Sequence, residues 1–140
     1  MRIRLAPRSL KRVRSKLRRL THRHAGQSLA QVRDALNLVI VGWVNYFALA
    51  DAQSHLQRLD QWLRRRLRQL IWNQWKTPKN RYRNLLKVGV SEQEARYAAG
   101  SGHGDWRLAA SPPLHYGLSN ARLYHFGFKS FLQTYQLRHT

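Results

Sequence analysis

Two blocks of Lys and Arg that contain no carboxylate are the residues of this sequence with the clearest chemistry. Ten of the 26 basic residues lie within residues 1–23, and nine more lie within residues 64–87. The 140-residue chain carries a formal net charge of +20 at pH 7. Because such a charge repels itself, we expect the folded chain to work against a polyanion, and nucleic acid is the polyanion that basic blocks of this kind usually bind.

Basic side chains in these blocks would contact phosphates, which gives affinity without sequence information. A single run of charge is usually only the solvated face of a helix, but two runs, each on a helix with its own apolar stripe, favour binding. We therefore predict a nucleic-acid surface on both blocks. Its predicted residues are Lys11, Arg12, Arg14, Lys16, Arg18, Arg19, Arg64, Arg65, Arg68, Lys76, Lys79, Arg81, Arg83 and Lys87.

Acid–base and metal chemistry has little support in the sequence. The carboxylates are Asp34, Asp51, Asp60, Glu92, Glu94 and Asp105. Two-metal phosphoryl transfer needs clustered carboxylates, so we expect no polymerase or nuclease activity, no bound metal and no cofactor. His22 and His24 would point to different sides of a helix and extend its basic face. His103-Gly104-Asp105 is better placed for a ligand or a base, although a polar surface turn is the favoured interpretation.

Three long amphipathic helices are needed to position the basic blocks. Apolar residues recur at helical spacing, and Ser9 and Ser28 are suitable N-terminal caps. The pattern predicts helices from Ser9 to before Gly26, from Ser28 to about residue 50, and from about Ser54 to Trp75. Each helix has a single apolar stripe and the connections are short, so we expect a three-helix bundle.

The third predicted helix carries cations and tryptophans away from its leucine stripe. At about 100° per residue, Arg64, Arg65 and Arg68 fall on the side opposite the leucines. Trp72 and Trp75 permit two interpretations, stacking on exposed RNA bases or packing of the following segment, and packing is favoured.

Aromatic residues of the second predicted helix are assigned to the core on the same reasoning. These are Trp43, Tyr46 and Phe47. Asn45 lies among them, and a polar side chain between aromatic rings needs a hydrogen-bond partner.

The chain after Thr77-Pro78 has shorter patterns separated by Gly and Pro. We predict short helices over residues 79–87, 91–99, 113–117, 120–126 and 129–136, with the 100–105 loop as the most mobile part. No segment alternates with a period of two residues. The predicted fold class is therefore all-α, with a three-helix bundle followed by a compact module of short helices.

Several motifs resemble the thumb and maturase regions of bacterial group II intron reverse transcriptases. In the first half they are Gly42-Trp43-Val44-Asn45-Tyr46-Phe47, Leu59-Asp60-Gln61-Trp62, Arg65-Arg66, Trp72 and Trp75-Lys76. In the second half, Gly104-Asp105-Trp106-Arg107, Ser111-Pro112, residues 118–120 and Gly127 resemble the maturase-specific region called domain X. The resemblance covers nearly the whole chain.

The resemblance implies that residues 1–77 form a helical thumb and residues 78–140 form domain X. In the family this region binds group II intron RNA and helps it fold for splicing. Full-length relatives also carry a reverse transcriptase palm with paired aspartates, which have no counterpart here, so the chain by itself is expected not to be an enzyme. An RNA/DNA template-primer duplex and a palm domain, in cis or in trans, are further implied partners. Met1 lies where the thumb would begin, which suggests a truncated reading frame or an excised fragment.

Two other functions compete with an intron-specific maturase module. One is a non-specific nucleic-acid-binding remnant of a mobile element. The other is a membrane-active cationic protein, but the first predicted helix lacks aromatic anchors on its basic face, and we expect no membrane partner. The absence of cysteine and of a recognisable secretory signal favours the cytoplasm as the location.

Overall fold

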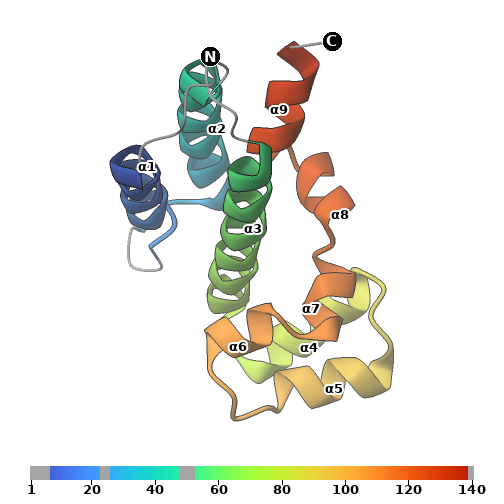
Figure 1. Ribbon diagram of the computed structural model, residues 1–140. Coiled ribbons are helices and arrows are strands. Elements are labelled where there is room, and N and C mark those ends of the chain that lie inside the picture. The colour runs from blue at the N-terminus through green and yellow to red at the C-terminus, as the bar shows by residue number, and fades with distance from the viewer. Residues whose placement is uncertain (1–6, 23–25, 48–52, 139–140) are drawn as a thin grey trace. The chain divides into compact units, whose positions relative to one another are not determined.

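The computed structural model describes residues 7–22, 26–47 and 53–138, and these residues form helices and no strand. The predicted all-α fold class is confirmed (Figure 1). The helices are α1 (Pro7–Leu20), α2 (Leu29–Phe47), α3 (Gln53–Trp75), α4 (Pro78–Lys87), α5 (Glu92–Ala99), α6 (Asp105–Ala109), α7 (Pro112–Gly117), α8 (Asn120–His125) and α9 (Phe131–Arg138). None of these helices is both long enough and apolar enough to cross a membrane.

Contacts divide the chain into two compact units, and the division falls inside α3. The first unit comprises residues 1–63 and 127–140, and the second comprises residues 64–126. The compact units therefore do not follow the predicted boundary at residue 77. The C-terminal helix α9, which we expected in the second module, packs against α2 in the first unit (Figure 1).

The first unit buries the apolar stripes that the sequence predicts. Val13 and Leu17 of α1, Leu36 of α2, and Leu56 and Leu59 of α3 are all buried. α1 and α2 pack directly against each other. The predicted bundle of α1, α2 and α3 is thus joined by α9 as a further helix.

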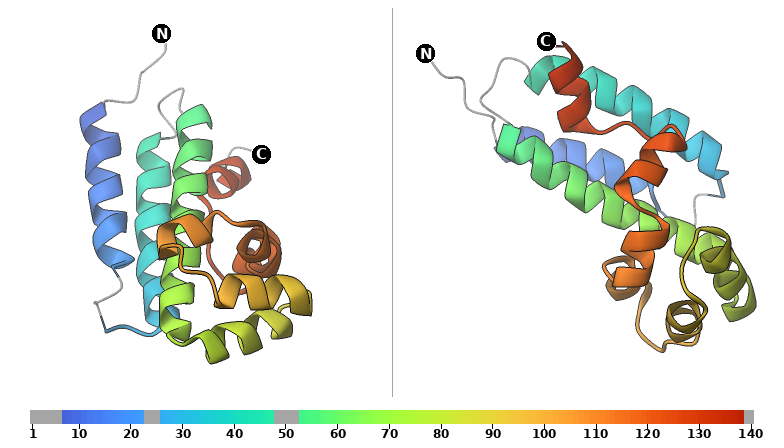
Figure 2. Two further views of the ribbon diagram at one scale, coloured as in Figure 1. Left: turned by 90° about the horizontal axis from the view of Figure 1, so that it is seen from below. Right: turned by 90° about the vertical axis from the view of Figure 1, so that its right-hand side faces the viewer.

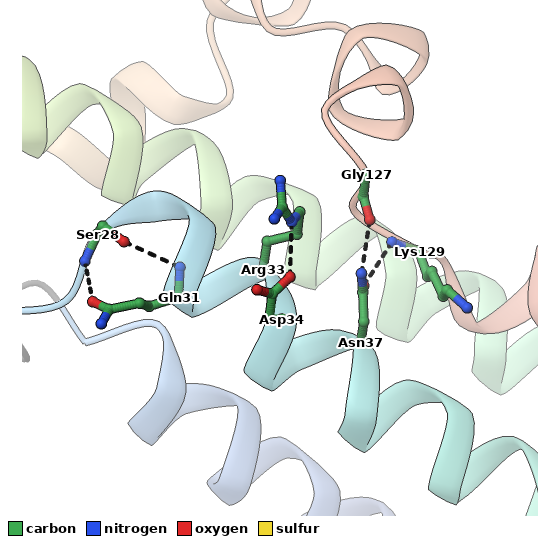
Figure 3. A network of polar contacts seen from close by, with 7 residues as sticks. All are labelled: Ser28, Gln31, Arg33, Asp34, Asn37, Gly127 and Lys129. Carbon is green, nitrogen blue, oxygen red and sulfur yellow. Dashed lines mark hydrogen bonds and ion pairs between the residues drawn. The ribbon is translucent and has the colours of Figure 1, made fainter.

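Two polar side chains hold the segment that leads into α9. Asn37 of α2 donates from Nδ2 to the Gly127 carbonyl at 2.7 Å, and its Oδ1 accepts from the Lys129 amide at 3.0 Å (Figure 3). Gly127 adopts a φ of +98°, and a Cβ there would lie 3.0 Å from Cδ of Arg33. Both features favour glycine at this turn.

Asp60 fixes the first turn of α9. Its buried carboxylate accepts from the Phe131 amide at 2.6 Å and from the Leu132 amide at 2.9 Å. Ser130 accepts from the next amide, that of Gln133, at 3.0 Å. The amides at a helix N-terminus have no partner within the helix, and a negative charge there is also stabilised by the positive end of the helix dipole. Asp60 is therefore a structural carboxylate.

We expect Asp60→Ala to destabilise the chain by about 2 kcal/mol, because buried amides would lose their acceptors. Asp60→Asn keeps one acceptor oxygen and should lose about half as much. Urea denaturation followed by circular dichroism measures the effect. Asp34→Ala, which removes an exposed carboxylate that pairs with Arg33, is the matched control and should change stability by less than about 0.5 kcal/mol. Equal losses in the two alanine variants would contradict the structural role of Asp60.

The second unit gathers α4 to α8 with the second half of α3 (Figure 2). α4 packs on α5, and α7 contacts α4, α5 and α6. Leu67, Trp72, Leu85, Leu114 and Leu118 lie in its core. α7 approaches residues 88–90 so closely that a Cβ at Gly117 would lie 2.7 Å from a methyl group of Val88. This contact requires glycine at position 117.

Three helices of the second unit begin after a side chain that caps their first turn. Thr77 accepts from the Asn80 amide, Ser91 from the Glu94 amide and Ser119 from the Arg122 amide. The helix α6 was not predicted. It has only five residues and starts directly after Gly104, so it is too short to show a periodic pattern.

Candidate nucleic-acid interface

The first unit has an open hollow of about 570 Å³ on the basic side of α1. Its lining residues are Arg8, Lys11, Arg12, Ser15, Lys16 and Arg19 of α1 and Trp43 of α2. Their spacing of three and four residues places the α1 side chains on one face of the helix. All six α1 side chains are exposed, and no carboxylate lines the hollow. We call this the α1 hollow.

The structure brings four predicted site residues together in the α1 hollow, namely Lys11, Arg12, Lys16 and Arg19. Arg8 also lines it but was not among the predicted residues. It lies one turn before Arg12, so helical spacing could have identified it.

Trp43 forms the aromatic wall of the α1 hollow. Its ring is half-buried and meets the ring of Tyr46 edge-on, with centroids 5.5 Å apart and planes at 77°. Tyr46 is exposed, and its hydroxyl lies 2.9 Å from Ser9 Oγ of α1. The prediction that Tyr46 belongs to the core is therefore wrong, because its side chain is exposed beside α1. Trp43 is only half-buried, because one side of it lines the hollow. The side chain of Phe47 lies outside the described residues.

Asn45, for which we predicted a hydrogen-bond partner, accepts from a guanidinium nitrogen of Arg138 on α9. This contact confirms the prediction.

Arg14 and Arg18 lie on another side of α1 from the hollow. Their guanidinium groups lie 5.8 Å and 5.6 Å from the centroid of the Trp62 ring on α3. Cations at such distances from an aromatic face are attracted by the ring quadrupole. These two arginines therefore help to pack α1 against α3, and they do not line the α1 hollow.

Arg68 corrects the prediction for the third helix. Its residue exposure is 2%, so the expectation that it lies on an exposed face is wrong. Nε donates to the Leu118 carbonyl and Nη2 to Oδ1 of Asn120, both at 2.8 Å. Burial, followed by repulsion from Arg64, lowers the pKa of Arg68 to about 10. Residues 118–120 cover the side of α3 that helical periodicity had assigned to solvent.

We expect Arg68→Gln to destabilise the second unit by about 1.5–3 kcal/mol, because two hydrogen bonds from a charged donor are lost and the buried Leu118 carbonyl remains unpaired. The shorter glutamine side chain at position 68 does not reach the Leu118 carbonyl and Asn120 at the same time. Thermal and urea unfolding measure the loss. Arg83→Gln, which changes an exposed arginine of α4, should leave the free energy of unfolding within about 0.5 kcal/mol of the parent value.

Arg65 and Arg81 are also held by contacts within the second unit. Arg65 donates from Nε and Nη2 to the Trp106 carbonyl at 3.0 Å and 2.8 Å, and its guanidinium lies 3.9 Å from the Trp106 ring centroid. Arg81 donates to the Trp72 carbonyl at 3.1 Å and pairs with Asp105 at 3.8 Å. The Gly104-Asp105-Trp106-Arg107 motif thus anchors α6 to α3 and α4 through two arginines.

The exposed cations of the second unit form a stripe on α4. Lys79, Arg83 and Lys87 are spaced by four residues and are all exposed, so they share one face of the helix. Lys76, in the turn before α4, is also exposed and has a φ of +60°. We call Lys79, Arg83 and Lys87 the α4 stripe.

The pKa of His115 on α7 responds to the positive charges near it in the second unit. Partial burial lowers its pKa, and repulsion from three nearby cations lowers it further. These cations are Arg68, Arg65 and Arg64. A nearby cation disfavours the charged imidazolium, so removing one should raise the pKa.

We therefore expect Arg64→Gln to raise the pKa of His115, as measured by an NMR titration of its ring. Arg107→Gln removes a cation that does not contribute to this shift, so it should leave the His115 pKa nearly unchanged. An unchanged His115 pKa in Arg64→Gln would show that the potential has another source.

Three carboxylates of the described residues form separate ion pairs. Asp34 pairs with Arg33, Glu92 with Arg96, and Asp105 with Arg81. Within residues 7–22, 26–47 and 53–138, no three His, Asp or Glu side chains are grouped so that they could hold a metal ion. His22 is exposed, whereas His24 and Asp51 lie outside the described residues.

A family model for the group II intron maturase-specific domain matches residues 10–89. The match covers more than half of the chain, so the chain belongs to this family, and the predicted relationship is confirmed. Membership indicates a function of the maturase type, and the maturase-specific domain is by itself non-catalytic. A search of curated proteins found no match. The matched residues extend across position 77, and the assignment of thumb and domain X to its two sides stays a prediction.

Proposed function

We propose that this chain binds group II intron RNA and assists the folding and splicing of that RNA. The observation that carries the proposal is the α1 hollow, where five cations and one tryptophan meet without a carboxylate. Membership of the maturase-specific family supports a group II intron as the RNA, and the hollow offers a surface for its phosphates.

The geometry of the α1 hollow suits a polynucleotide strand. Arg8 and Arg19 are eleven residues apart, which corresponds to about 16 Å along the helix. Several consecutive phosphates fit within that length, because a nucleic-acid strand carries one charge every few ångströms. Trp43 offers a ring edge or face to an unpaired base beside the phosphates.

The α4 stripe is a second surface that we propose for RNA. Lys79, Arg83 and Lys87 are exposed on one face, so all three can reach phosphates without breaking a contact of the fold. Of the other predicted residues, Arg68 is not proposed, because it is buried, and Arg65 and Arg81 are held by protein partners.

Other features of the proposal rest on the family alone. We propose that the chain has no catalytic role of its own and acts beside a reverse transcriptase palm domain, supplied in cis or in trans. A template-primer duplex is then a further ligand, and the cytoplasm is the proposed location. Adding a separately purified palm domain and measuring primer extension with and without this chain tests the partnership.

The proposed function is tested with a self-splicing group II intron transcript and a scrambled RNA of equal length. We expect the chain to bind the intron transcript more tightly than the scrambled RNA and to increase its rate of splicing. Failure to bind either RNA at low salt would overturn the proposal.

One observation favours a second function, namely general binding to nucleic acid. Contacts to phosphates carry no sequence information, and the cations of the α1 hollow and the α4 stripe are suited to such contacts. Equal affinity for the intron and the scrambled RNA, with no change in splicing, would support this function.

A further inference from the structure

The second unit contains a cavity that differs in character from the cationic surfaces. Its volume is about 380 Å³, which falls within the range of about 300–1,000 Å³ usual for ligand pockets. It is lined by residues of α3, α5, α6 and the start of α7 and by residues on either side of α6. Figure 2 shows the short helices α5, α6 and α7 close to one another. All its lining residues belong to residues 64–126, so the cavity lies within one compact unit.

The floor of this cavity is apolar, and most of its side chains are small or are proline rings. Ala98, Leu108 and Pro113 are buried, whereas Ala110 and Pro112 line the cavity and remain exposed. Small and ring-shaped side chains leave space against which a flat aromatic group can pack.

The rim of the cavity combines one exposed aromatic ring with three basic side chains. Tyr97 of α5 is 66% exposed, and Arg65, His103 and Arg107 complete the rim. No Asp or Glu lines the cavity. The hydrogen bonds of Arg65 to the Trp106 carbonyl hold its guanidinium in place, so this cation is ordered before any ligand arrives.

We infer that this cavity receives one unpaired nucleotide of the bound RNA. The base packs on the apolar floor beside Tyr97, and Arg107 contacts its phosphate. Arg65 stays bonded to the Trp106 carbonyl and adds positive charge to the rim. An apolar floor alone would suit many small molecules, but a cationic rim without a carboxylate selects an anion with a flat apolar part. The inference rests on the proposed function, because the nucleotide belongs to an RNA that the basic surfaces hold.

The inference is tested with two RNA hairpins that differ by one bulged adenosine, using the full chain and fluorescence anisotropy. Stacking of a single base on a protein ring is strong enough for the bulged hairpin to bind about tenfold more tightly than the paired hairpin. Tyr97→Ala should reduce this ratio to nearly one while leaving the affinity for the paired hairpin unchanged. Tyr97→Phe keeps the ring and should keep the preference.

A second variant fills the cavity without removing a contact. Ala110→Leu places a larger side chain at an exposed position of the lining and should also abolish the preference. Ala121→Leu makes the same change at an exposed position of α8 outside the cavity and is the matched control, so it should keep the preference. Unchanged melting temperatures in these variants show that the fold is retained.

The outcomes separate the two proposals. Equal binding of both hairpins by the parent chain, or a preference that survives both Tyr97→Ala and Ala110→Leu, would overturn the nucleotide pocket and leave the proposed function intact. Binding of neither hairpin would overturn both. A third outcome is that the parent binds a fluorescent adenosine monophosphate, Ala110→Leu does not bind it, and the parent shows no preference for the bulged hairpin. This outcome would assign the cavity to a free nucleotide and overturn its role in RNA binding.

Discussion

Replacing Lys11, Arg12, Lys16 and Arg19 together with Gln should make the plot of log affinity for RNA against log salt less steep, by about three units of slope. Each phosphate contact that is lost removes about 0.7 to 0.9 from this slope, because fewer counterions are released on binding. The parent chain, if it contacts six to ten phosphates, should lose about three to five decades of affinity between 50 and 200 mM salt. Fluorescence anisotropy with one structured RNA over that range measures both slopes.

Two exposed cations outside the α1 hollow provide the control for this experiment. Arg58 of α3 and Lys129, which precedes α9, lie in the same unit, and Arg58→Gln with Lys129→Gln should change the slope much less per charge removed. The fourfold variant should keep its melting temperature, because its changed side chains are exposed and removing like charges relieves repulsion. A parent-like slope in the fourfold variant would show that the α1 hollow is not the RNA surface, and the α4 stripe would become the better candidate.

Local patterns predicted the helices well because each long helix has one stripe that burial selects. Leu56, Leu59, Leu63, Leu67 and Leu70 recur at helical spacing, and all five are buried. The same regularity concealed the division of the chain, since the leucine stripe of α3 continues without interruption across residues 63 and 64. Nothing local to α3 marks the point where one compact unit ends and the next begins.

Contacts between distant segments account for the features that helical periodicity did not predict. Asp60 reaches the first turn of α9, 71 residues further along the chain, and this contact helps to bring α9 to the first unit. Arg68 reaches Leu118, 50 residues away, and is buried by that segment. Helical periodicity states which residues share a face, but it does not state which faces a later segment will cover.

The family motifs illustrate the same limit. Asp60 and Trp106 could be recognised as motif residues from the sequence, but their roles depend on partners that are far away in the chain. Asp60 caps α9, and the Trp106 carbonyl holds Arg65. The α1 hollow could be predicted more fully, because most of its residues come from a single helix and only Trp43 comes from another.

Trp72→Ala should produce the largest loss of stability among single substitutions, about 3–5 kcal/mol, because it leaves a large cavity in the second unit. Trp72 has an exposure of 0%. Its ring lies 6.0 Å from that of Trp75 and 4.7 Å below the Arg81 guanidinium. These contacts confirm that Trp72 packs within the protein. The burial of its ring leaves no face on which an RNA base can stack.

Trp72→Phe separates loss of packing from loss of the indole nitrogen. Nε1 of Trp72 is buried and has no hydrogen-bond partner among the described residues, so removing this donor should cost little and the smaller ring should account for most of the change. We expect Trp72→Phe to lose less than half as much stability as Trp72→Ala in urea denaturation. RNA affinity, measured at a low temperature where both variants are folded, should stay within about twofold of the parent value, since a ring buried in the core contributes no stacking. Lost affinity with unchanged unfolding would instead mean that Trp72 is exposed in solution and stacks on RNA.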